Sequence, residues 1–179
     1  MGDCESTQEL RTRATTILAH LRDSRLFPKA VTAFSVWARD DARQVWRIVA
    51  ALGSSEQTVA NFTQAIIAEE TAGAGIVANL AATADESPRY YQPSSAQAPN
   101  TWFKADPHAH ATTETLAVFL LPDPAGIPIG AFALTSAQKD ALEHGTDGPS
   151  ERLSLIIEQC SLTLIGVARR AYVLWKGGA

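Results

Sequence analysis

The feature that most constrains the fold is the longest apolar run, TLAVFLLPDPAGIPIGAFALT, because prolines divide it. Its hydropathy alone would suit a membrane-spanning helix, but Pro122, Pro124 and Pro128 fall in its middle, and proline disrupts a helix interior. Two short runs rich in aliphatic and aromatic residues flank a Pro-Asp-Pro-Ala-Gly segment, a pattern that predicts a β-hairpin over residues 115–134. The alternative is a short helix over residues 113–121 followed by an irregular return.

Most of the remaining chain has apolar residues at helical spacing. Ser6 and Glu9 have the spacing of a capping box, so a first helix is expected from there to about residue 23. Pro28 suits the first turn of a second helix that runs to Gly53. Its apolar stripe consists of Val31, Phe34, Trp37, Ala38, Val45, Ile48, Val49 and Leu52.

Three or four further helices are expected. Residues 54–84 are expected to form either one long helix or two helices. A division is expected at the glycines of residues 72–75, because glycine weakens a helix interior. Ser136 caps a short helix over residues 137–144. The last and longest helix is expected over residues 150–176, and it is apolar on more than one side, which is typical of a central helix or of one shared with another subunit.

The sequence therefore predicts a mainly α protein with five or six helices. At 179 residues and 46% hydrophobic content, the chain suits one domain over residues 1–179. Residues 1–6 are expected to be frayed, and residues 86–111, which contain four prolines, predict a long irregular loop. The expected hairpin would be the single β element.

Charge and cysteine content limit the classes of function. A net charge of −4 argues against nucleic-acid binding, which requires clustered lysine and arginine. The two cysteines, Cys4 and Cys160, suggest no disulfide, and the first residues do not resemble a signal peptide, so a reducing, cytoplasmic location is expected. The prolines in the apolar run argue against a membrane span.

No catalytic or cofactor motif is recognisable: a P-loop, a dinucleotide-binding glycine pattern, HExxH and GxSxG are all missing. His108 and His110 would point the same way in an extended segment and could share a metal, but HxH is short and common. Glu70 falls on an apolar helical stripe, where burial would raise its pKa. The favoured interpretation places these residues in a loop and at a helix end, with no metal and no cofactor, and Cys160 as a buried hydrophobe.

The leading hypothesis for function is a soluble intracellular interaction protein, an accessory, adaptor or chaperone-like subunit rather than an enzyme. It would form a homo-oligomer or bind a protein partner through its last helix and the aromatic residues of the loop. The alternative is a small helical enzyme, or a ligand- or metal-binding protein, that uses Glu70 with His108 and His110. The expected interaction surface consists of Tyr90, Tyr91, Trp102, Phe103, Leu162, Ile165, Val173 and Trp175.

Overall fold

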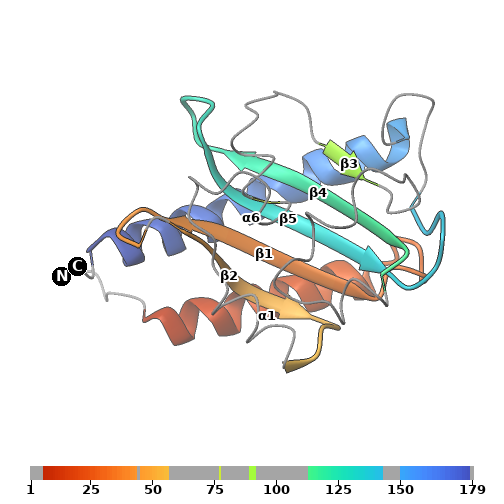
Figure 1. The fold of residues 1–179 in the computed structure, drawn as a ribbon, viewed down its shortest axis with the longest axis horizontal. Coiled ribbons are helices and arrows are strands. Elements are labelled where there is room, and N and C mark those ends of the chain that lie inside the picture. Colours follow the sequence, from red (N-terminus) through yellow and green to blue (C-terminus); the bar gives the residue numbers. More distant parts are fainter. Residues whose placement is uncertain are drawn as a thin grey trace.

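A computed structural model describes residues 6–43, 45–56, 77, 89–91, 113–142 and 150–177. These residues form an antiparallel sheet with two helices packed against it (Figure 1). The strand order in the sheet is β2-β1-β5-β4-β3. In chain order the elements are α1 (Thr7–Asp23), β1 (Ala33–Asp40), β2 (Val45–Leu52), β3 (Arg89–Tyr91), β4 (Thr115–Pro122), β5 (Pro128–Ser136) and α6 (Glu151–Gly177).

The centre of the sheet joins strands that are far apart in sequence. β1 forms a hairpin with β2 on one side and pairs with β5 on the other, with Phe34 opposite Leu134 and Val36 opposite Phe132. β4 and β5 form a second hairpin, which continues the sheet to β3. The long-range pairing of β1 with β5 therefore holds the two hairpins together.

Both helices cover the same face of the sheet. α1 packs on β2 and β1, and α6 packs on β1, β5 and β4. Along β1 alternate residues point to this face, so Phe34, Val36 and Ala38 are buried against the helices. The helices contribute Leu10, Ala14, Leu18, Leu153, Ile157, Cys160, Leu164, Val167, Ala168, Ala171 and Trp175 to the same core.

One glycine lets α6 approach the sheet closely. A Cβ atom on Gly130 of β5 would overlap the Ala168 side chain of α6 and would lie 2.8 Å from the carbonyl oxygen of Trp37. Ala168 is itself fully buried. Small residues on both elements thus set the distance between helix and sheet, since larger ones would overpack this contact.

The expectation of a mainly α protein is wrong, and residues 28–52 explain most of the error. This segment forms β1 and β2, joined by a turn at Asp41, instead of one helix. Residues that lie four apart, such as Phe34 and Ala38, share a side of a helix but also share a side of a strand. The abundance of valine, isoleucine and tryptophan favours the strand, and β5 supplies the neighbour that β1 requires.

Two smaller expectations are also wrong. Residues 137–142 are not helical, and β3 lies within the segment expected to be an irregular loop. The predicted hairpin over residues 115–134 is present as β4 and β5, inside a larger sheet. Its turn is closed by Asp123, whose side chain accepts from the backbone N–H groups of Ala125 and Ile127, and by Gly126 at a φ of +82°.

The helix beginning at the capping box is α1. The Ser6 side chain accepts from the Glu9 backbone N–H, and the Glu9 carboxylate accepts from the Ser6 N–H at 2.6 Å. None of the helices in the described part of the chain is long and apolar enough to cross a membrane.

Candidate functional site

The face of the sheet opposite α1 and α6, here called the second face, carries a different set of side chains. Because successive residues of a strand point to opposite faces, Ser35, Trp37 and Arg39 of β1 project from it. Directly paired residues share a face, so Trp46 of β2 lies beside Arg39, and Ala133 of β5 lies beside Ser35.

Small residues form the centre of the second face. One row across the four longer strands consists of Ala51, Ser35, Ala133 and Val118. In the next row Trp37 lies between Ile48 and Ala131. Ala131 and Val118 are fully buried, and Ala133 and Ile48 are nearly so. This pattern produces an apolar floor with tryptophan side chains toward the β1–β2 hairpin.

Among the residues that the structure describes, two indole N–H groups belong to this face, and they differ in their partners. Nε1 of Trp37 donates to Oγ of Ser35 at 3.0 Å. Trp46 is only 3% exposed, yet its Nε1 has no acceptor in the part of the chain that the structure describes, as is also the case for Nε1 of Trp175 on the helix side of the sheet. A buried donor without a partner is uncommon in folded proteins and is often satisfied by a bound molecule or water.

Arg39 links the second face to the end of α6. Its guanidinium forms an ion pair with Asp41, and the other carboxylate oxygen of Asp41 accepts a 2.6 Å hydrogen bond from the Tyr172 hydroxyl. Burial would raise the pKa of Asp41, but the hydrogen bonds from Tyr172 and Arg39 outweigh it and hold the pKa below its ordinary value. The same carboxylate raises the pKa of Tyr172 by accepting its proton in a hydrogen bond.

A second charged group, formed by Asp40 and Arg47, lies next to Asp41 on the helix side of the sheet. Asp40 is almost fully buried and pairs with Arg47 at 2.8 Å. The Arg47 guanidinium lies 4.3 Å from the centre of the Trp175 ring of α6. Asp40 at the end of β1 and Asp41 directly after it therefore both connect the β1–β2 hairpin to the last turns of α6.

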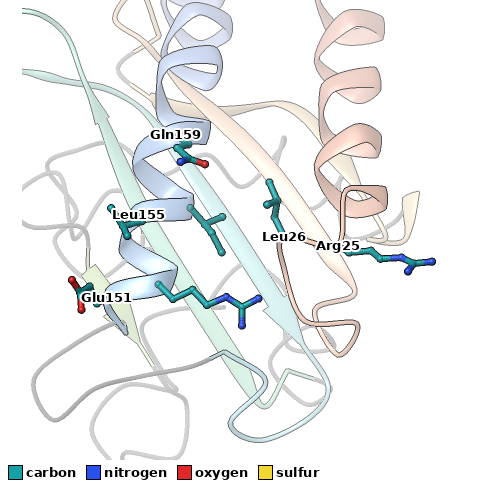
Figure 2. A pocket seen from close by; sticks show the side chains of 7 residues that line it. Arg25, Leu26, Glu151, Leu155 and Gln159 are labelled. Carbon is teal, nitrogen blue, oxygen red and sulfur yellow. The ribbon is translucent and has the colours of Figure 1, made fainter.

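A surface hollow lies at the other end of α6, between its first turns and the loop after α1 (Figure 2). It has a volume of about 400 Å³ and a neighbouring part of about 230 Å³. Figure 2 shows that Arg25 extends away from α6, and that Glu151 lies on the far side of the helix from the loop. Arg25 and Glu151 therefore do not converge on a common point in the hollow.

The expected site residues are only partly described by the structure. Glu70, His108, His110, Trp102 and Phe103 lie outside the described residues, so their proposed roles stay predictions. Within the described ranges no three His, Cys, Asp or Glu side chains form a possible metal site. Tyr90 and Tyr91 belong to β3, where their backbones pair with Ala117 and Leu116.

The four residues expected on the surface of the last helix separate into two groups. Leu162 and Val173 are exposed, whereas Ile165 is half-buried against the core and Trp175 lies within it. Sequence reasoning missed the second face entirely. The alternation of Ser35, Trp37 and Arg39 with Phe34, Val36 and Ala38 was the available signal for it.

Comparison with known proteins shows the fold. No family model matches the sequence, and no curated protein matches it. Similar solved structures include the GAF domain of an Acinetobacter phosphoenolpyruvate-protein phosphotransferase, with a TM-score of 0.63, 12% identity, and coverage of 93% of this chain and 86% of that one. The type II free methionine-R-sulfoxide reductase of Thermoplasma acidophilum has a TM-score of 0.61, 13% identity, and coverage of 93% and 96%.

A third similar structure contains a bound molecule. It is the free methionine-R-sulfoxide reductase of Neisseria meningitidis in complex with its substrate, with a TM-score of 0.54, 12% identity, and coverage of 95% of this chain and 81% of that one. At these identities the likeness shows the GAF-type α/β fold alone. The expectation of a helical adaptor is wrong, because the chain has this α/β fold. The comparisons contain no evidence for a partner, so the interaction surface stays a prediction.

Proposed function

We propose that this protein is a small-molecule-binding domain whose ligand lies on the second face of the sheet. The observation that carries the proposal is the buried Trp46 N–H without an acceptor, on the same face as Arg39 and the small-residue floor. A ligand with an apolar body and one hydrogen-bond acceptor would satisfy this donor. The substrate complex of the Neisseria reductase supports the proposal, since it is a domain of the same fold with a bound small molecule.

The proposed activity is binding rather than thiol-dependent reduction. Reduction of a sulfoxide to a thioether takes two electrons, which protein thiols provide as they form a disulfide. This chain has no cysteine between Cys4 and Cys160. Cys160 is buried in α6 on the opposite face of the sheet, and burial raises the pKa of its thiol, which lowers its reactivity. Residues 5–159 therefore contribute no thiol to the second face.

The four tryptophans provide a direct test by NMR. Each indole N–H gives one ¹H–¹⁵N signal, which single Trp→Phe substitutions assign. We expect that a ligand from a panel of amino acids, methionine sulfoxide, mononucleotides and carboxylic acids shifts the signals of Trp37 and Trp46. The signal of Trp175 should stay in place, because its ring lies on the helix side of the sheet.

Two variants locate the binding. Ala133→Leu fills the floor of the second face and should abolish the shifts, whereas Leu155→Ala alters the hollow beside α6 and should leave them. Loss of binding in Leu155→Ala with normal binding in Ala133→Leu would move the site to the hollow. A panel that perturbs none of the indole signals of the second face would count against the proposal.

A further inference from the structure

At the β1–β2 hairpin the second face presents hydrogen-bond donors. Trp46 lies directly across from Arg39, so an indole N–H and a guanidinium are neighbours, with their Cβ atoms about 5 Å apart. Neither group can accept a hydrogen bond. Among the described residues of β1, β2, β4 and β5, none that projects from this face has a carboxylate or a carboxamide. These donors therefore require acceptor atoms on the bound molecule.

Ser35 adds a donor at the floor of the face. Its Oγ accepts from Nε1 of Trp37 at 3.0 Å, which uses a lone pair and leaves the hydroxyl proton to donate. Within the described part of the chain this proton has no acceptor. The hydroxyl lies in the row of small residues between Ala51 and Ala133. It can thus bind a further acceptor atom of a molecule that lies on the floor.

The carboxylate beside Arg39 belongs to Asp41, and both of its oxygens are engaged. Oδ1 receives the Nε–H of Arg39, and Oδ2 receives the hydroxyl of Tyr172 at 2.6 Å. An ammonium group of a ligand would have to displace one of these donors. A guanidinium, by contrast, has five N–H groups in a planar fork, so an arginine held by one carboxylate can bind a second. Asp41 therefore acts as a positioning residue for Arg39.

We propose, on the basis of the function proposed above, that the molecule bound on the second face is a carboxylic acid without an amino group. Its carboxylate lies between Nε1 of Trp46 and the guanidinium of Arg39, and its apolar body lies on the floor formed by Val118, Ala131 and Ala133. Trp46 is nearly fully buried, and hydrogen bonds to a charged acceptor are stronger where water is excluded. An amino acid would bring an ammonium group to a face whose described side chains offer it no acceptor.

Matched compounds test the class of ligand on the original protein. Hexanoate and phenylacetate are each compared with the amide and the amine of the same apolar body, namely hexanamide and hexylamine, and phenylacetamide and 2-phenylethylamine. Titrations are followed by the indole N–H signals of Trp37 and Trp46, with Trp175 as the internal control. We expect a carboxylate to shift both signals, the amide to bind about tenfold more weakly because it lacks the charge, and the amine to cause no shift.

Two variants separate the charge from the indole donor. Arg39→Met retains the aliphatic stem, and the carboxylate and the amide should then bind within about threefold of each other, whereas Arg39→Lys should retain part of the preference. Trp46→Phe removes the N–H and should weaken both compounds by about tenfold, as measured at the Trp37 signal. Arg43→Met removes an exposed guanidinium from the turn of the same hairpin and should change neither affinity. Circular dichroism of each variant shows whether the fold is intact.

The outcomes distinguish the class of ligand from the proposed function. An amine or an amino acid that binds as tightly as the carboxylates overturns the class, as does a preference for carboxylate that persists in Arg39→Met. A response of Trp37 and Trp46 to another compound of the panel, but to neither carboxylate, also overturns the class and leaves the proposed function standing. Signals that no compound shifts count against both.

Discussion

The Tyr172 hydroxyl of α6 donates a 2.6 Å hydrogen bond to Oδ2 of Asp41, which follows β1, and so joins residues 131 positions apart. Asp41 also pairs with Arg39 of the second face. A residue of the proposed binding face and the end of the last helix thus share one carboxylate. This connection is a sensitive point at which to test the structure.

Tyr172→Phe should reduce the free energy of unfolding by about 1 kcal/mol, because it removes a hydrogen bond to a charged acceptor that is only partly buried. Urea denaturation measures the change. Arg22→Ala breaks an ion pair with Asp23 that is exposed to solvent, and it should have little effect. Equal losses of unfolding free energy in both variants would mean that the Tyr172 hydrogen bond stabilises the protein no more than an exposed ion pair does.

The difference in the free energy of unfolding between the original protein and Tyr172→Phe should depend on pH at both the acid and the alkaline end of the range. The pKa of Tyr172 is raised, so the contribution of its hydroxyl is complete below about pH 10 and is lost as the pH rises through the folded-state pKa. The pKa of Asp41 is lowered, so its contribution is present above about pH 4 and is lost as the pH falls through the folded-state pKa. Denaturation at acid, neutral and alkaline pH should show that this difference is largest between the two limits and falls outside them. A difference that is the same at every pH would contradict the prediction.

Two glycine substitutions should have opposite effects on stability. Gly130→Ala should destabilise the protein by about 2 kcal/mol or more, because the new methyl overlaps Ala168 and the backbone of Trp37. Gly166→Ala should stabilise the protein by about 0.5–1 kcal/mol, because alanine is the better helix former and its methyl meets no atom within 4 Å. Thermal unfolding of dilute protein compares them, and a stable Gly130→Ala variant would refute the close approach of α6 to β5.

The Cys160 thiol should react slowly with a thiol reagent in the native protein. The side chain is buried in the core, and burial raises the pKa of its thiol, so little thiolate is available. A Cys4→Ser variant leaves Cys160 as the single cysteine. Its labelling rate should rise steeply with denaturant, while fast labelling without denaturant would show that α6 does not cover the sheet as described.

Local sequence patterns predicted correctly those elements whose conformation is decided by residues close together in the chain. The capping box at Ser6 and Glu9 determines where α1 begins, because the two residues satisfy each other's backbone donors. The prolines and Asp123 similarly mark the turn between β4 and β5. In both segments the residues that decide the conformation lie within a few positions of one another.

Residues 28–52 could not be assigned by the same reasoning. Their apolar positions fit a helical stripe as well as an alternating strand, so the local pattern does not decide between helix and strand. The decisive neighbour of Phe34 is Leu134, which lies on β5 about a hundred positions away. A contact of this kind leaves no periodic signal in either segment.

The sequence by itself determined the helix at the capping box, the proline-broken hairpin and the low cysteine content, because these depend on residue type and near spacing. The tertiary structure alone decided that β1 joins two hairpins into one sheet. It also decided that Ser35, Arg39 and Trp46 share a face with Ala133, and that Asp41 meets Tyr172. These relationships depend on strand pairing and helix docking, which bring together residues whose separation along the chain carries no information about their contact.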